Sequence, residues 1–212
     1  MLKLGMWEKA NHHLVLFIIQ LLNVKETKTE SQIQMIKYAL TCTLNEIEKF
    51  FLLWFLFYCM GTVKEFLVCF LSLASLRIFM GGSHRKTMLG CFVQSFLSFK
   101  IIILLSKWVE LDNWMCYPIF IIAIAFIWKF TPIIPPQRPK YNDFQCMRFK
   151  AMALTALLIL SIFSAALQGN YGNCIQWTVL VQIVENSMGI LIALNFKYGI
   201  WFCSRLCGKS YL

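Results

Sequence analysis

The sequence contains little charge and no polar stretch long enough to fold as a soluble domain. Asp, Glu, Lys and Arg together make up 14% of its 212 residues, whereas hydrophobic residues make up 59%. Soluble domains are about 45–50% apolar on a comparable count, and the polar segments here are too short to bury a core of their own. We therefore expect a polytopic membrane protein rather than a soluble one.

Acidic residues are half as frequent as basic ones. The 10 Asp and Glu stand against 20 Lys and Arg, which gives a net charge of +10. In a chain this apolar, the excess indicates basic loops held against an anionic inner leaflet. The expected partner of the basic surface is therefore the lipid bilayer, and no nucleic acid is expected.

The sequence also lacks a disulfide framework, a zinc cluster and a signal-peptide cleavage site. Its nine cysteines are odd in number and lie mostly in apolar segments, where cysteine acts as a small buried hydrophobe. The loop that holds His84 and Cys91 has no second pair of ligands nearby, so neither a metal nor another cofactor is expected. Residues 1–22 are basic and then apolar without a small-residue cleavage motif, so we expect them to be retained.

The hydrophobic pattern predicts an all-α transmembrane bundle preceded by amphipathic N-terminal helices. The whole chain, 1–212, is expected to form one membrane-embedded domain, with the amphipathic helices in 1–49 and the bundle in 50–212. Residues 6–22 and 30–50 are the amphipathic candidates, lying on the membrane surface or against the bundle. The alternative for 6–22 is a short span. In the second candidate, apolar residues recur every three or four positions: Ile33, Ile36, Leu40, Leu44 and Ile47.

Six apolar segments follow, and they predict six spans. The segments are 47–63, 66–80, 89–106, 117–134, 151–168 and 174–196. A span needs about 17–25 residues, so the first two are short, and Val63–Glu65 separates them. A version with four spans, in which 47–80 is partly interfacial, therefore stays open.

The distribution of basic residues predicts the orientation of these spans. If both termini and the loops 81–88 and 135–150 face the cytoplasm, only Lys64, Lys100 and Lys107 lie elsewhere. This asymmetry follows the positive-inside rule. Trp108, Trp114 and Tyr117 then suit an interfacial belt on the outer side. The proline cluster at 131–143 ends one span and predicts a stiff, extended basic loop on the inner side.

The segment 77–91, "RIFMGGSHRKTMLGC", contains a candidate cysteine nucleophile. On a regular helix His84 and Cys91 would share one stripe but lie about 10 Å apart along the axis. Gly81 and Gly82 favour a tight turn, which could fold the imidazole of His84 back over Cys91. If the next helix begins near Thr87, the helix dipole would also favour a Cys91 thiolate.

The basic residues and glycines of this segment can be explained either by catalysis or by membrane topology. Arg77, Arg85 and Lys86 add positive potential near the thiol, and the glycine N–H groups could serve as oxyanion donors. Basic residues after a span also set topology, and glycines are common in loops, so spacing alone leaves both explanations open.

Further along, Glu185 and Asn186 are polar groups inside a predicted span, which is a functional hint. They could orient His84, bind substrate backbone or pair with another helix.

The spacing Arg-x6-His-x6-Cys, with Gly-Gly just before the histidine, resembles the accessory gene regulator B family of bacterial membrane endopeptidases, which mature quorum-sensing peptides. The length, the amphipathic start and the basic proline-rich loop are compatible with it. The resemblance implies that Cys91 is the nucleophile and His84 its base, and that Arg77 and Gly82 are needed for activity. The residue after the histidine is often small in the family but is Arg85 here, which affects the expected substrate preference.

This resemblance implies a cysteine endopeptidase of the bacterial cell membrane, with its active site at the cytoplasmic face. It would cleave the tail from a short precursor peptide, and an internal cysteine of the precursor would resolve the acyl-enzyme into a cyclic thiolactone. The precursor is expected to be amphipathic with an acidic C-terminal tail, attracted by Arg85, Lys86, Arg138 and Lys140. A homodimer is left open. The rival functions are a small transporter or exporter and a non-catalytic assembly factor.

Overall fold

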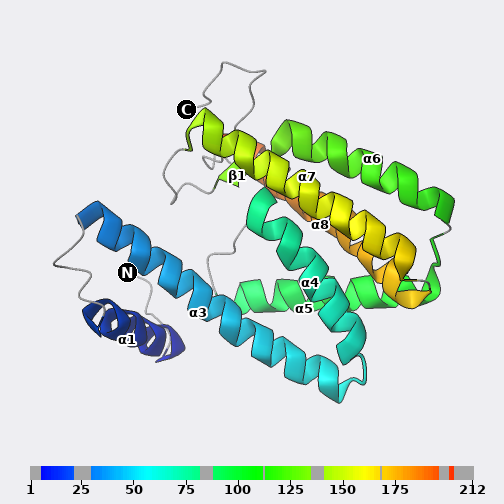
Figure 1. Ribbon diagram of the computed structural model, residues 1–212. Coiled ribbons are helices and arrows are strands. Elements are labelled where there is room, and N and C mark those ends of the chain that lie inside the picture. Colours follow the sequence, from blue (N-terminus) through cyan, green and yellow to red (C-terminus); the bar gives the residue numbers. More distant parts are fainter. Residues whose placement is uncertain are drawn as a thin grey trace. The chain divides into compact units, whose positions relative to one another are not determined.

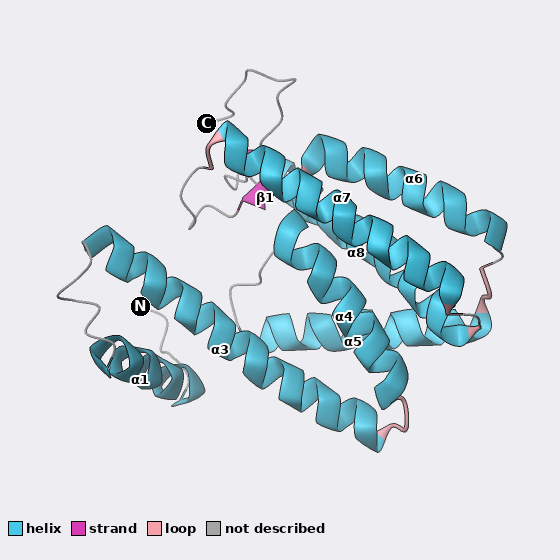
Figure 2. Ribbon diagram, in the orientation of Figure 1, coloured by secondary structure: helices cyan, strands magenta, loops and turns pink. Residues whose placement is uncertain are grey.

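The computed structural model describes residues 6–21, 30–81, 88–111, 113–134, 141–167, 169–195 and 201–202. These residues are almost entirely helical (Figures 1 and 2), which confirms the predicted all-α class. Two two-residue strands, β1 (Ile133–Ile134) and β2 (Trp201–Phe202), pair antiparallel. The chain divides into two compact units, Met1–Cys59 and Met60–Leu212. The expectation of a single functional domain over 1–212 stays a prediction.

The first unit contains α1 (Met6–Leu21) and α3 (Glu30–Cys59), which pack against each other. Val15 and Ile19 of α1 are buried against Ile33, Ile36, Leu40 and Leu44 of α3. The apolar stripe predicted for residues 30–50 is therefore a packing face. Its last member, Ile47, is exposed.

Helix α3 is longer than either segment predicted for this region. The sequence was expected to form an amphipathic helix over 30–50 and a separate span over 47–63, but one helix runs without a break to Cys59. Neither glycine nor proline occurs between these bounds to interrupt it. The break comes at Gly61, whose φ is +68°, and Val63–Glu65 begins the next helix instead of forming the separator.

In its described residues the second unit is a bundle of five helices. They are α4 (Val63–Met80), α5 (Met88–Trp108), α6 (Asn113–Phe130), α7 (Asp143–Ala166) and α8 (Asn170–Asn195). Helix α8 contacts each of the other four, and α7 also packs on α4 and α6 (Figure 1). Helix α8 therefore forms the centre of the bundle, and residues that it carries can reach every neighbouring helix.

The ends of α7 are set by local sequence. Asn142 begins the helix with a capping box, in which the Gln145 side chain accepts a 3.0 Å hydrogen bond from the Asn142 N–H. At the other end α7 turns into α8, and Gly172 makes the turn compact. A Cβ at Gly172 would lie 2.2 Å from the carbonyl oxygen of Leu167, so only glycine fits there.

The bundle carries apolar side chains outside and many polar side chains inside. On α5 the exposed residues repeat every three or four positions, as for a lipid-facing stripe: Leu89, Val93, Leu97, Ile101 and Leu104. The interior holds buried Ser, Thr, Asn and Gln side chains. A surface of this kind is too apolar for water, and it suits a bilayer.

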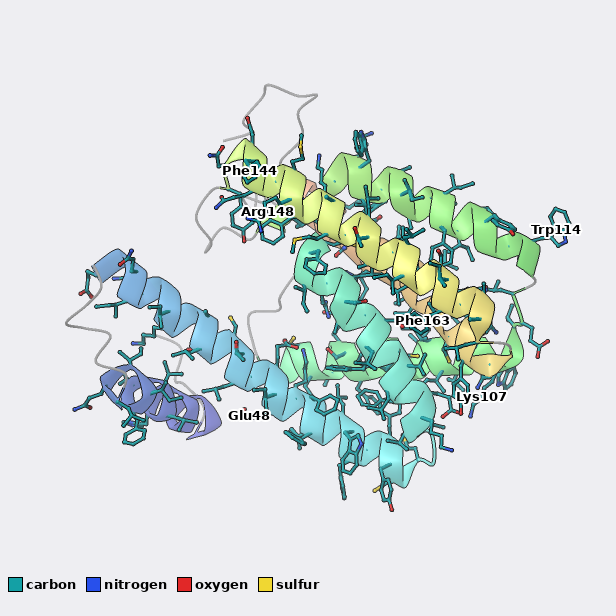
Figure 3. The ribbon with its side chains drawn as sticks, in the orientation of Figure 1. Glu48, Lys107, Trp114, Phe144, Arg148 and Phe163 are labelled. Atoms are coloured by element: carbon teal, nitrogen blue, oxygen red, sulfur yellow. The ribbon has the colours of Figure 1, made fainter. Side chains whose placement is uncertain are left out.

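Among the described residues, two helices are long and apolar enough to cross a membrane, Leu89–Trp108 and Asp143–Ala166. The apolar helix Tyr117–Phe130 is shorter. The prediction of six or four spans therefore stays open. The aromatic residues expected in an outer belt are exposed at one end of the bundle: Trp108, Trp114 and Tyr117. Figure 3 shows Trp114 projecting from the start of α6.

At that end Asn173 of α8 fastens the α5–α6 connection. Its Nδ2 donates hydrogen bonds to the carbonyl oxygens of Ser106 (2.7 Å) and Val109 (2.9 Å), and its Oδ1 accepts one from the Leu111 N–H (3.1 Å). An ion pair of 3.8 Å between Lys107 and Glu65 joins α5 to α4 nearby.

Candidate functional site

Gly81 makes the turn that leaves α4 toward the predicted His84 loop. Its N–H donates a 3.0 Å hydrogen bond to the Arg77 carbonyl oxygen, and its φ and ψ are +79° and −173°. That backbone region is accessible essentially to glycine alone. A Cβ at Gly81 would also lie 2.3 Å from the Ile133 carbonyl oxygen of β1. Gly81 is therefore specified twice, by its conformation and by the close approach of a second segment.

Cys91 lies in the first turn of α5, which begins at Met88, one residue after the expected start. It is a reduced, partly buried cysteine. At this end of α5 the backbone N–H groups of the first turn have no partner within the helix. Two further reduced cysteines described in the second unit, Cys69 and Cys174, are fully buried.

Arg77 forms an ion pair with Glu185 inside the bundle. Nη2 of Arg77, in the last turn of α4, lies 3.5 Å from Oε2 of Glu185 on α8, and the two side chains are 24% and 14% exposed. The other carboxylate oxygen accepts a hydrogen bond from Ser98 on α5. The Glu185 carboxylate thus connects three helices: α4, α5 and α8.

Ser98 lies on the same stripe of α5 as Cys91. The two residues are seven positions apart, which corresponds to an angular offset of ~20° and an axial distance of roughly 10 Å. The Arg77–Glu185 pair is therefore attached to α5 two turns into the bundle from the Cys91 end.

Several predicted site residues lie outside the described part of the chain. These are His84, Gly82, Arg85, Lys86, Arg138 and Lys140. Arg77, Gly81 and Cys91, which flank the segment with His84, are described. The fold brings Arg77 together with Glu185, one of the two polar residues noted in the last span.

Sequence reasoning noted Glu185 and Asn186 but missed Ser98 and Gln182. Gln182 and Asn186 are 1% and 2% exposed. Neither amide atom of Gln182 has a hydrogen-bond partner among the described residues, and the same holds for Nδ2 of Asn186. Polar side chains within a span were the available signal. Serine is too common in such helices for Ser98 to have been singled out.

The described part of the chain holds no group of three or more His, Cys, Asp or Glu that could bind a metal ion. A groove of about 570 Å³ lies between α4 and α7 and is lined mainly by apolar side chains, among them Leu71, Phe79, Ile159 and Phe163. None of the predicted site residues lines it. Its walls offer no ionisable group, so it contributes no chemistry to the site around Cys91.

Comparison with known proteins identifies relatives over most of the chain. A sequence profile of the family Accessory gene regulator B matches residues 13–185. A putative AgrB-like protein of Clostridium beijerinckii is 30% identical over 175 residues, which cover 80% of this chain and 85% of that protein. Putative AgrB-like protein 1 of Clostridium perfringens (strain 13 / Type A) is 25% identical over 125 residues, covering 58% and 67%. No solved structure gives a significant match.

Proposed function

The chain belongs to the accessory gene regulator B family, and we propose that it is a cysteine endopeptidase that processes a short precursor peptide. Family membership and the apolar helices make it a membrane protein with a role in the accessory gene regulator system. The proposed activity goes further: it removes the precursor's C-terminal tail and allows the remaining peptide to cyclise as a thiolactone.

The observation that carries the proposal is the environment of Cys91. It is a reduced, partly buried cysteine in the first turn of a helix, and it follows a turn that Gly81 restricts to one conformation. An activated cysteine nucleophile needs a stabilised thiolate and a nearby base. We assign the first requirement to the start of α5 and the second to His84.

In the proposed reaction His84 accepts the proton of the Cys91 thiol, and the sulfur attacks a peptide carbonyl of the precursor. We assign stabilisation of the oxyanion to the Gly82 N–H, because the Gly81 N–H, also expected as a donor, is already bonded to the Arg77 carbonyl oxygen. The C–N bond breaks, the tail departs as an amine with the proton returned by His84, and a thioester to Cys91 remains. An internal cysteine thiol of the precursor then attacks this thioester, forming the thiolactone and releasing Cys91 as a thiol.

The energetics of these steps constrain the site. Exchange of one thioester for another is nearly balanced, whereas conversion of an amide to a thiolactone is uphill. Departure of the tail and removal of the product must therefore draw the sequence forward. Partial exclusion of water near the membrane face would help, because it disfavours hydrolysis of the acyl-enzyme.

We place the active site and both termini at the cytoplasmic face of the bacterial cell membrane, in a multi-pass topology, because that orientation puts most basic residues inside. The proposed substrate is an amphipathic peptide whose acidic tail is attracted by Arg85, Lys86, Arg138 and Lys140. A homodimer is compatible with this scheme but is not required by it.

Co-expression with a cognate precursor tests the activity. The wild-type chain, Cys91→Ser and His84→Ala are expressed with the precursor, and the peptide products are weighed by mass spectrometry. We expect the wild type to remove the tail and both variants to leave the precursor intact. Full processing by either variant contradicts the mechanism.

Thiol labelling separates this function from a transporter or an assembly factor. A peptidase should show Cys91 modified much faster than the other cysteines, with activity lost in step, because only an activated thiol reacts so selectively. A transporter should show no such preferred thiol. An assembly factor should keep its function in Cys91→Ala.

A further inference from the structure

We propose that Glu185 is a positioning residue of the peptidase site, holding both helices that flank the His84 segment. The inference rests on the proposed function and adds a residue to it. Glu185 does not contact substrate in this scheme. It acts through Arg77 on one side and Ser98 on the other.

The first line of evidence is the connection that Glu185 makes. One carboxylate oxygen faces the Arg77 guanidinium at 3.5 Å, and the other accepts a hydrogen bond from Ser98. The Arg77 carbonyl receives the Gly81 N–H that opens the turn, while Ser98 shares the α5 stripe of Cys91. The carboxylate therefore fixes where α4 ends relative to the stripe that carries the nucleophile.

The second line of evidence is the cost of the pair. Charged side chains within apolar helices are expensive and are rarely kept without a role. A buried ion pair is also often no more stabilising than apolar residues of the same size. At 3.5 Å the contact is long for a charge-assisted hydrogen bond. The presence of the pair is thus better explained by geometry at the site than by the free energy of folding.

The Lys107–Glu65 pair provides a matched control. It also joins two helices of the same bundle, α4 and α5, but it lies at the opposite end from Cys91, beside the α5–α6 connection. Glu65→Gln removes an interhelical charge pair as Glu185→Gln does, without touching the predicted site. Cys69 is fully buried, so it stays unlabelled in a folded variant and becomes labelled in an unfolded one.

The first measurement is steady-state processing of a synthetic precursor by the full chain in lipid nanodiscs. Because misplacement of a catalytic group by about 1 Å can cost on the order of 100-fold, we expect Glu185→Gln to lower kcat by about 10- to 100-fold with little change in KM. Glu65→Gln should leave kcat near the wild-type value. A Glu185→Gln kcat equal to that of Glu65→Gln overturns the inference.

The second measurement is the alkylation rate of Cys91. If the pair only stabilised the fold, removing either partner would change this rate in the same direction. Removing one partner leaves the other charge uncompensated, two turns into the bundle from the Cys91 end of α5, and a nearby charge alters the reactivity of a thiol according to its sign. Glu185→Gln should therefore speed alkylation and Arg77→Gln slow it. The double variant should return to the wild-type rate while its kcat stays low. Changes of the same sign in both single variants overturn the inference.

The outcomes separate this inference from the proposed function. If Cys91→Ser processes the precursor fully, the proposed function has failed. If Cys91→Ser is inactive but Glu185→Gln matches the Glu65→Gln control, only the role of Glu185 has failed. If labelling shows Glu185→Gln to be unfolded, Ser98→Ala is the deciding variant. It removes only the hydrogen bond between α5 and Glu185 and keeps the Arg77–Glu185 ion pair. A several-fold loss of kcat in Ser98→Ala supports the inference, and a wild-type kcat overturns it.

Discussion

Replacement of Gly81 by alanine tests how strictly the turn before His84 is specified. The φ and ψ of +79° and −173° belong to a region that costs a residue with a side chain about 1–3 kcal/mol. The added Cβ would also stand 2.3 Å from the Ile133 carbonyl oxygen. That oxygen belongs to the backbone and cannot rotate away, so the two segments must move apart, at a further cost of about 1–3 kcal/mol.

The expected destabilisation of Gly81→Ala is therefore about 2–6 kcal/mol. For a chain of this size, 1 kcal/mol corresponds to roughly 2–4 °C in Tm, so the apparent Tm in detergent should fall by roughly 4–24 °C. Processing of the precursor should fall further than the folded fraction does, because the turn that leads to His84 is displaced.

Gly169→Ala is the matched control. Gly169 also has a positive φ, +76°, but a Cβ there would meet nothing within 4 Å. It should therefore show only the cost of the left-handed backbone, about 1–2 kcal/mol, and keep its activity. If Gly81→Ala and Gly169→Ala have the same Tm and the same processing rate, the close approach of Ile133 does not constrain the site.

Two further substitutions test the polar interior of the bundle. Gln182→Met should raise the apparent Tm, because it removes a buried amide that has no partner among the described residues. The expected gain in stability is about 1–3 kcal/mol. A fall in Tm would show that the amide is hydrogen-bonded in the folded protein. Asn173→Ala should lower stability by about 2–4 kcal/mol, since it removes hydrogen bonds to Ser106, Val109 and Leu111. Thermal unfolding measures this loss, and the alkylation rate of Cys91 should stay unchanged; a changed rate would show that the two ends of the bundle are coupled.

Local patterns in the sequence predicted the positions of most helices, although α7 begins at Asp143, inside the expected loop 135–150, and not at 151. The apolar run at 89–106 became α5, and the run at 174–196 became α8, each with bounds within a few residues of those expected. These elements depend on short-range hydrophobic content and on breakers such as the proline cluster, which a single sequence displays directly. The boundary between α3 and α4 is misplaced in the prediction, because Val63–Glu65, with its Lys64 and Glu65 charges, indicated a separator there, whereas Gly61 makes the break.

Contacts between helices could not be predicted in the same way. The sequence identified Arg77 and Glu185 separately, but it does not say which faces of α4 and α8 meet. The close approach of Gly81 to Ile133 could not be predicted either. The glycine indicates a turn, but only the fold shows that the β1 backbone lies beside it. The pairing of His84 with Cys91 stays a prediction, since His84 lies outside the described residues.

The three-helix connection at Glu185 also sets an order of events during synthesis. Ser98 and Glu185 are 87 residues apart in the chain, and ribosomes add about 5–20 residues per second. For roughly 4–17 s, therefore, Arg77 and Ser98 have been made while the carboxylate that joins them has not. The flanks of the predicted active site can be fixed only when the last helix arrives, so an incompletely synthesised chain would present the nucleophile without the contact that holds it in register.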